Sequence, residues 1–184
     1  DLALDAAGAE QIFAAAHVNL TRRRAAALTE RTEGWPVGLY LAAVIARGGH
    51  GEALMIYGDD RLVADYLYHE SFIRLPEGIQ RFLRRTAVLD QMCAPLCDAI
   101  LQDSGGQQQL RSLEASNLFV IPLDRRREWY RYHGLFREFL LSELRRVEPD
   151  VIMKLHLRAA DWYEANGSPA MAVEHLLNTN ERDR

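Results

Sequence analysis

The segment that begins at Gly34 constrains the fold more than any other part of the sequence. Gly34, Trp35 and Pro36 precede an almost uninterrupted apolar run, residues 37–46. Proline suits the first turn of a helix, because its fixed φ fits there and its missing N–H would have no partner. The run is far shorter than the ~20 apolar residues that cross a bilayer. We therefore expect a buried helix at the centre of a bundle, ending at residues 47–49, and no membrane span.

The remainder of the first 74 residues has the periodicity of short helices. Residues 6–16 and 21–33 are alanine-rich, with leucine at helical spacing. Asp59 or Asp60 can cap a further helix. Residues 1–74 are therefore expected to form a four-helix unit.

The middle of the chain has a different order of elements. The expected elements are helices from Pro76, from Pro95 and over residues 107–116, strands over residues 119–123 and 129–133, and a closing helix over residues 135–146. Three helices followed by a hairpin and a closing helix is the order of a winged helix. We expect such a domain, with a small β-hairpin, over residues 75–147.

The last segment, residues 148–184, contains two helices separated by a helix stop and a helix start at residues 166–169. Val173, Leu176 and Leu177 form the expected inner face of the second helix. An antiparallel helix pair with large apolar faces usually begins a helical repeat array. The fold is thus expected to be mainly α, with a lid bundle, a winged helix and a terminal TPR-like hairpin.

Composition and cysteine usage exclude several classes of protein. A formal net charge of −4 and a hydrophobic content of 48% describe an ordinary soluble protein, rather than a disordered tail or a polybasic nucleic-acid binder. Cys93 and Cys97 have no further ligands at zinc spacing, so we expect two reduced thiols in a cytoplasmic protein. Asp59 and Asp60 resemble metal-binding acids at the end of a strand, but Gly58 interrupts that strand. We expect no metal.

The sequence contains no phosphate-binding loop of its own. A Walker A loop needs glycines followed by Lys and Ser or Thr, and the one lysine, Lys154, lies within an expected helix. Because the chain starts at Asp1 without a methionine or a leader, we expect it to be part of a longer protein. His133 directly precedes an expected helix, whose N-terminus attracts anions. Taken alone, His133 and the Gly34 to Pro36 segment each have an ordinary structural interpretation.

Several separated segments, in a fixed order, support a more specific interpretation. They are Thr32–Leu39, Asp65–Leu67, Phe82–Leu89, Ala94–Ala99, Leu113–Phe119, Tyr130–Arg137 and Leu157–Gly167. With these segments the chain resembles the MalT-type, ATP-dependent LuxR transcriptional regulators, which belong to the STAND signalling ATPases. The resemblance extends over nearly the whole chain.

The resemblance implies an order of domains. A P-loop ATPase domain would precede Asp1, residues 1–74 would be the helical lid, and residues 75–147 the winged helix. Residues 148–184 would begin a helical-repeat sensor, and a DNA-binding helix-turn-helix would follow.

The resemblance also implies the site residues. In the wider class, a Gly-x-Pro motif packs against the adenine, and a winged-helix histidine just before a helix contacts the ADP phosphate. These roles fall on Gly34, Trp35 and Pro36, and on His133. The class often has Asp after that histidine, whereas Gly134 follows here, so the acidic partner is absent or supplied elsewhere.

The expected function is that of a module gated by ATP and ADP, which are the implied cofactors. The module would not be an enzyme by itself, whereas the parent would be a slow signalling ATPase. Its partners would be the P-loop domain and the repeat sensor of the same chain, a second copy of the activated parent, and DNA through another domain. ADP would hold the parent closed, and sensor ligand with ATP would open it.

Two other interpretations stay open. In the first, the winged helix binds DNA, with Arg125 to Arg127 on phosphates and residues 107–116 in a groove. Against it, the third helix has only Arg111 as a cation, and Glu114 balances that charge. In the second, the chain is a purely structural helical scaffold.

Overall fold

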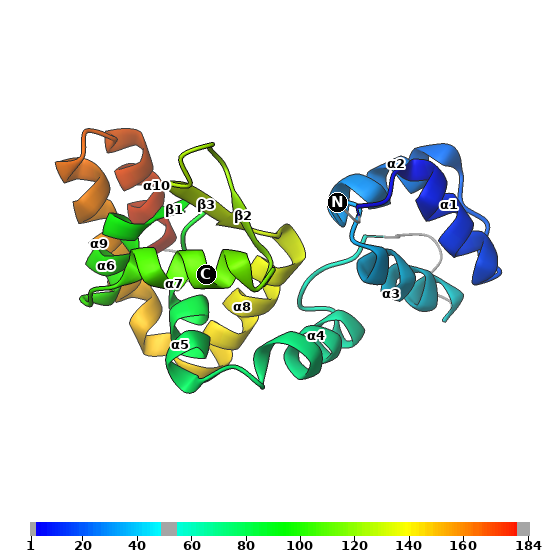
Figure 1. Ribbon diagram of the computed structural model, residues 1–184, viewed down its shortest axis with the longest axis horizontal. Helices are drawn as coiled ribbons and strands as arrows, with labels where there is room; N and C mark the ends of the chain where they lie inside the picture. The colour runs from blue at the N-terminus through cyan, green and yellow to red at the C-terminus, as the bar shows by residue number, and fades with distance from the viewer. Residues whose placement is uncertain (1–2, 49–54, 180–184) are drawn as a thin grey trace. The chain divides into compact units, whose positions relative to one another are not determined.

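The structure, a computed structural model, describes residues 3–48 and 55–179 (Figure 1). Gly49, the expected end of the apolar helix, lies outside these residues, as do the last five residues of the expected terminal domain, 180–184. No helix in the described part of the chain is long and apolar enough to cross a bilayer.

The chain divides into two compact units, of which unit 1 comprises residues 1–70 and 134–139. Its helices are α1 (Ala6–Ala15), α2 (Arg22–Arg31), α3 (Pro36–Arg47), α4 (Arg61–Leu67) and the start of α8 (Gly134–Val147). Side chains cap the first two helices, since Asp5 accepts the Gly8 N–H and Thr21 accepts the Arg24 N–H. These caps satisfy backbone donors that would otherwise lack a partner.

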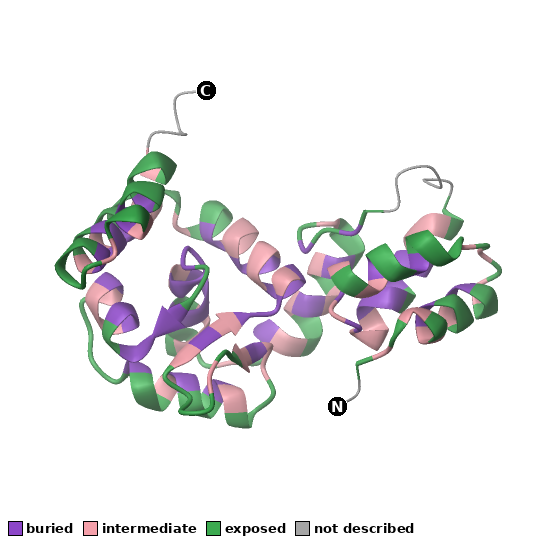
Figure 2. Cartoon of the chain, turned by 90° about the horizontal axis from the view of Figure 1, so that it is seen from above, coloured by how far each residue is buried: buried purple, intermediate pink, exposed green. Residues whose placement is uncertain are grey.

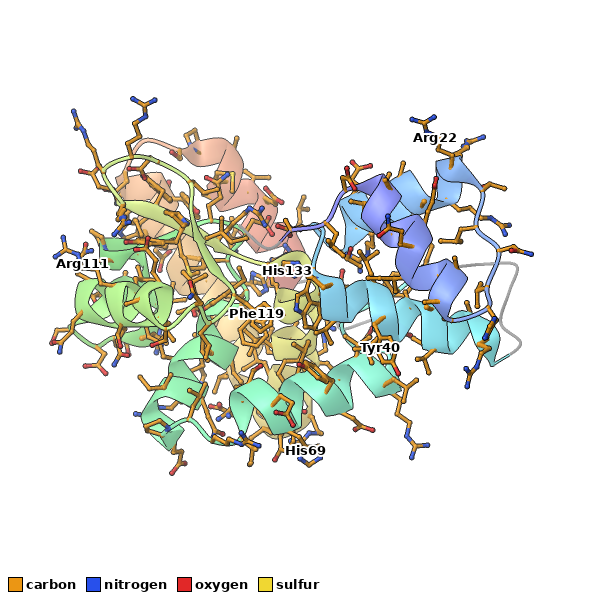
Figure 3. All side chains as sticks on the ribbon, turned by 45° about the vertical axis from the view of Figure 1, so that its right-hand side comes forward. Arg22, Tyr40, His69, Arg111, Phe119 and His133 are labelled. Atoms are coloured by element: carbon orange, nitrogen blue, oxygen red, sulfur yellow. The ribbon has the colours of Figure 1, made fainter. Side chains whose placement is uncertain are left out.

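Helix α3 starts at Pro36, as the sequence predicts, but it is buried along one side rather than all round. Leu39 and Ala43 are fully buried, whereas 58% of the Tyr40 surface is exposed. The helix therefore packs within unit 1 through its small and branched side chains, and Tyr40 points outward (Figure 3).

The start of α4 differs from the prediction. Asp60 occupies the N-cap position, yet its carboxylate accepts the Tyr57 N–H at 2.7 Å and makes no cap bond to the helix. Residues 55–57 before it form no strand. The helix continues into a π-helical turn, η1 (Tyr68–Phe72).

Unit 2 comprises residues 71–133 and 140–184 and contains the winged helix. Its first elements are α5 (Glu77–Thr86), β1 (Met92–Cys93), α6 (Ala94–Leu101), α7 (Gly106–Ala115), β2 (Val120–Pro122) and β3 (Trp129–Tyr132), before the remainder of α8. The strands form an antiparallel sheet in the order β1-β3-β2. The expected hairpin and the mainly α fold are confirmed. The two-residue strand β1 was not predicted, because it is too short to show an alternating pattern.

The core of unit 2 lies between the sheet and the helices. Tyr130 is fully buried, and the buried Tyr132 hydroxyl hydrogen-bonds Thr86 Oγ1 at 2.7 Å. Cys93 and Cys97 are buried and free, as expected. Figure 2 shows the buried residues gathered on the inner sides of the helices and along the strands.

Helices α9 (Ile152–Ala165) and α10 (Pro169–Thr179) follow a short 3-10 turn, η2 (Pro149–Val151). They form the expected hairpin, and α9 packs on α6, with Arg158 donating to the Ile100 carbonyl at 2.8 Å. The Trp162 ring lies edge-on to Trp129 of β3, with centroids 6.5 Å apart. The hairpin is therefore part of unit 2.

The predicted inner face of α10 was wrong. Ala172 and His175 are buried, whereas Val173, Leu176 and Leu177 are exposed by 54%, 44% and 64%. The His175 Nδ1 atom lies 2.9 Å from Nδ1 of His156, and its ring stacks on Tyr163. Residues three apart share a helix face, so turning position 175 inward turns the aliphatic positions outward.

Candidate functional site

The turn after α2 requires the residues found there. Glu33 and Gly34 both have positive φ, 51° and 71°, a conformation that favours glycine. A Cβ on Gly34 would lie 2.5 Å from the Leu4 carbonyl oxygen. The Leu4 N–H donates a hydrogen bond to the Gly34 carbonyl at 2.8 Å. Gly34 thus lets two backbone segments meet closely.

Trp35 and Pro36 complete the turn and begin α3. Trp35 is the N-cap residue, and its ring lies 5.9 Å from the ring of Tyr66. The indole also lies over Gly38, where a Cβ would meet it at 2.6 Å. Gly34, Trp35 and Pro36 therefore form one turn of unit 1 that leads directly into α3.

Helix α8 begins at Gly134, whose N–H donates to Glu33 Oε1 at 2.9 Å. A carboxylate at a helix N-terminus satisfies a free donor and interacts favourably with the helix dipole. Glu33 directly precedes Gly34, so one hydrogen bond joins the Gly34 to Pro36 turn to the first residue of α8.

A second carboxylate holds α8 one turn further on. The Glu138 carboxylate accepts hydrogen bonds from the Arg31 guanidinium and, at 2.8 Å, from the Gly58 N–H. The Nε–H of Arg31 donates to the Ile56 carbonyl at 2.8 Å, and its guanidinium lies over the Tyr57 ring. A Cβ on Gly58 would lie 1.9 Å from the Leu135 carbonyl oxygen, so the loop touches α8 directly.

His133 belongs to unit 2 and is the N-cap residue of α8. Only 6% of its surface is exposed. Its N–H donates to the Phe119 carbonyl at 2.8 Å, and the two rings lie edge to face, 5.9 Å apart (Figure 3). The structure therefore brings Gly34, Trp35 and Pro36 together, and it holds His133 in the other unit by its backbone and by ring packing.

Sequence reasoning missed Glu33, Arg31 and Glu138. Glu33 stands next to the motif, and that adjacency is the signal that could have identified it. Glu138 lies 107 residues from Arg31, and nothing in its spacing predicts the ion pair. Within residues 3–48 and 55–179, no group of three or more His, Cys, Asp or Glu side chains is placed to hold a metal ion.

The order of helices and strands in unit 2, with its β1-β3-β2 sheet, defines a winged-helix protein. Residues 68–152 match the family model for the MalT winged helix domain, and this part of the chain belongs to that family. The chain is a relative of the MalT-type transcriptional regulators.

Several curated proteins share sequence similarity with most of the chain. The HTH-type transcriptional regulator MalT of Vibrio parahaemolyticus is 31% identical over 157 residues, which are 82% of this chain and 17% of that protein. MalT of Serratia proteamaculans is 31% identical over 161 residues, 84% of this chain and 18% of that protein. The serine/threonine-protein kinase PknK of Mycobacterium tuberculosis is 30% identical over 171 residues, 91% of this chain and 15% of that protein. The chain thus spans less than a fifth of the length of these relatives.

Proposed function

We propose that the chain is the regulatory part of a transcriptional regulator switched by ATP and ADP. It closes over a nucleotide held by a P-loop domain elsewhere in the parent protein. It relays the state of a sensor domain, which α9 and α10 begin, to a DNA-binding domain in the same parent. Gly34, Trp35 and Pro36 pack against the adenine, and His133 contacts a phosphate. The activated parent self-associates, and it works in the cytoplasm.

The observation that carries this proposal is the hydrogen bond from Gly134 N–H to the Glu33 carboxylate, at 2.9 Å. It links the residue before the Gly34 to Pro36 turn with the residue after His133, so both proposed contact points are attached to one bond. Such a linkage is what a switch needs, because a ligand shifts an equilibrium only through contacts that differ between two states.

The position of His133 also supports the proposal. It directly precedes the fourteen-residue helix α8, whose dipole favours anions near its N-terminus, where the Gly134 N–H already donates to the Glu33 carboxylate. A histidine there adds a side-chain donor to the same region. A hydrogen bond to a charged group contributes about 1.5–3 kcal/mol.

The test is ADP release from the parent protein. In the His133→Ala parent, ADP binding weakens by roughly ten- to a hundred-fold and basal activity rises. Release of a fluorescent ADP analogue, followed in a stopped-flow instrument, measures the effect, and a melting curve on the same sample shows that the variant is folded.

Tyr132→Phe is the matched control, because it alters the last residue of β3, which directly precedes His133. It removes the hydrogen bond to Thr86, so the melting temperature falls while ADP release stays close to that of the parent. Unchanged ADP release from a folded His133→Ala parent would leave the chain as a structural scaffold.

A further inference from the structure

The junction between α7 and the β2–β3 hairpin contains an open hollow of about 650 Å³. Arg111 and Glu114 of α7 line it, together with Arg126 and Arg127 of the hairpin turn. Ala115, Val120 and Pro122 give it an apolar part. All of these residues belong to unit 2. The hollow is therefore a concave, mainly polar surface with arginines beside a small apolar part.

The backbone of the turn that carries the arginines is held by hydrogen bonds to Asp124. The Asp124 carboxylate accepts the N–H groups of Trp129 and Arg126, both at 2.7 Å, and that of Glu128 at 3.2 Å. The Arg127 backbone has a φ of 56° and donates to the Asp124 carbonyl. The turn thus fixes the backbone positions from which its arginine side chains extend.

Glu114 does not balance Arg111, in contrast to the expectation from the sequence. Its carboxylate pairs with Arg127 at 3.2 Å and accepts the Tyr130 hydroxyl at 3.5 Å. Within the described residues, Arg111 and Arg126 make no ion pair. Figure 3 shows Arg111 projecting from α7 into solvent. The hollow therefore carries two cations with no acidic partner there.

These features point to carboxylates rather than to a nucleic acid. Strong electrostatic binding of duplex DNA rests on about six to ten phosphate contacts. Beyond the Arg127 pair, the described residues of α7 and the hairpin offer Arg111, Arg125, Arg126 and the half-buried Arg131, and the exposed Glu128 lies beside them. A guanidinium fork, by contrast, binds one carboxylate through two parallel hydrogen bonds. Two such forks beside a small apolar part match a short acidic peptide.

We propose that this hollow is a docking site for an acidic peptide segment of a partner protein. Two carboxylates of the segment pair with Arg111 and Arg126, and a small apolar side chain between them lies on Ala115, Val120 and Pro122. Arg127 does not bind the peptide directly. It keeps Glu114 neutralised, so that the hollow does not repel an acid.

The test measures fluorescence anisotropy of a labelled Glu/Ala peptide with this chain at low ionic strength. A Gln/Ala peptide of the same length is the uncharged probe. The Glu/Ala peptide binds saturably and the Gln/Ala peptide does not. Arg111→Ala and Arg126→Ala each weaken binding by about ten- to a hundred-fold, as expected for loss of a bond between charged groups.

Two further variants distinguish binding by specific side chains of the hollow from non-specific attraction by positive charge. Arg125→Ala removes the same charge from the same turn, but Arg125 does not line the hollow, so binding changes by less than about three-fold. Arg127→Ala weakens binding at least as much as Arg126→Ala, because it also leaves Glu114 uncompensated within the hollow. Circular dichroism of each variant reports whether it is folded.

Three results would overturn the proposal. One is an absence of saturable peptide binding by the folded chain. Another is an equal loss of binding from Arg125→Ala and Arg126→Ala, which would indicate only a diffuse field. The third is binding of a labelled DNA duplex more tightly than the peptide, which would assign the surface to nucleic acid. None of these results bears on ADP release from the parent, so the proposed nucleotide switch is tested separately.

Discussion

At the scale of single residues, Glu33 is the side chain on which the candidate site depends most. Glu33→Ala removes the acceptor for the Gly134 N–H, and we expect a loss of about 0.5–2 kcal/mol in the free energy of unfolding, as for other N-terminal caps. Glu33→Gln keeps an acceptor oxygen for Gly134 and loses the charge at the helix N-terminus, which contributes about 0.3–1 kcal/mol. Urea denaturation of both variants measures the difference. Equal losses would show that the hydrogen bond itself contributes nothing.

Alanine substitutions at two glycines should change the free energy of unfolding in opposite directions. A Cβ on Gly58 would lie 1.9 Å from the Leu135 carbonyl oxygen, so Gly58→Ala forces backbone apart and should cost about 1–3 kcal/mol. Gly78 lies in α5 with nothing within 4 Å of its Cβ position, so Gly78→Ala should stabilise the chain by up to about 1 kcal/mol. Thermal unfolding compares the two. A neutral Gly58→Ala variant would show that the loop and α8 separate at little cost.

Single residues also show how far the sequence predicts the site. Gly34 and Pro36 could be predicted because their conformations are local, a positive φ and a first helical turn. The partner of Glu33 could not, since Gly134 lies 101 residues away and contact between distant segments depends on packing. For the same reason the ion pair between Glu114 and Arg127 was not predicted. The sequence suggested Arg111 as the partner of Glu114 instead.

At the scale of elements, the β2–β3 turn should depend on pH. The pKa of the Asp124 carboxyl lies below its ordinary value, chiefly because the Trp129 N–H donates to it, followed by those of Glu128, Arg126 and Arg127. A depressed pKa stabilises the folded turn above the ordinary value of about 4, and this stability is lost as pH falls through the folded value. The protection factor of the Leu123 amide, which is the exchange rate of an unstructured peptide at the same pH divided by its own, should therefore fall in acid, because its N–H pairs with the Trp129 carbonyl across this turn.

Asp124→Asn is the control for that prediction. The amide cannot titrate, so the acid-dependent part of the exchange at Leu123 should disappear. At neutral pH the Leu123 amide of the variant should be less protected than that of the unsubstituted chain. The asparagine side chain offers one acceptor oxygen to the turn, where the carboxylate offers two. An unchanged pH profile in Asp124→Asn would assign the acid response to another group.

Some helices and strands could be predicted from the sequence more easily than others. Helices α3, α6 and α10 begin near prolines, and their starts could be predicted from the first-turn preference of that residue. Strand β1 could not, because its two residues are defined only by pairing with β3. The buried face of α10 was predicted wrongly because hydrophobicity favoured its aliphatic residues, while the His156 and His175 pair occupies the interior.

At the scale of the whole molecule, helix α8 belongs to both units. Its residues 134–139 count with unit 1 and its later residues with unit 2, so the matched family segment, 68–152, includes residues of each. Helical periodicity predicts α8 as one element and gives no sign of this division. The domain limits inferred from the sequence, at residues 74 and 147, stay predictions.

The exposed face of α10 provides a test of how the chain fits into a longer protein. Leu177 is 64% exposed, so Leu177→Glu in the isolated chain should change the free energy of unfolding by no more than about 0.5 kcal/mol. If α10 begins a repeat array in the parent, the next helical pair covers this face. The same substitution then loses the burial of a leucine, about 1.5–3 kcal/mol, and adds the cost of a buried charge.

Melting temperatures of Leu177→Glu in the chain and in the parent distinguish these cases. Asn178→Ala, at the neighbouring exposed position, is the control in both proteins, because it changes no apolar contact. A repeat array predicts a large fall in the parent alone, since stacked repeats share their hydrophobic surface with each neighbour. An equally small effect of Leu177→Glu in both proteins would mean that this face of α10 stays exposed in the parent, and that the α9–α10 hairpin does not start a repeat array.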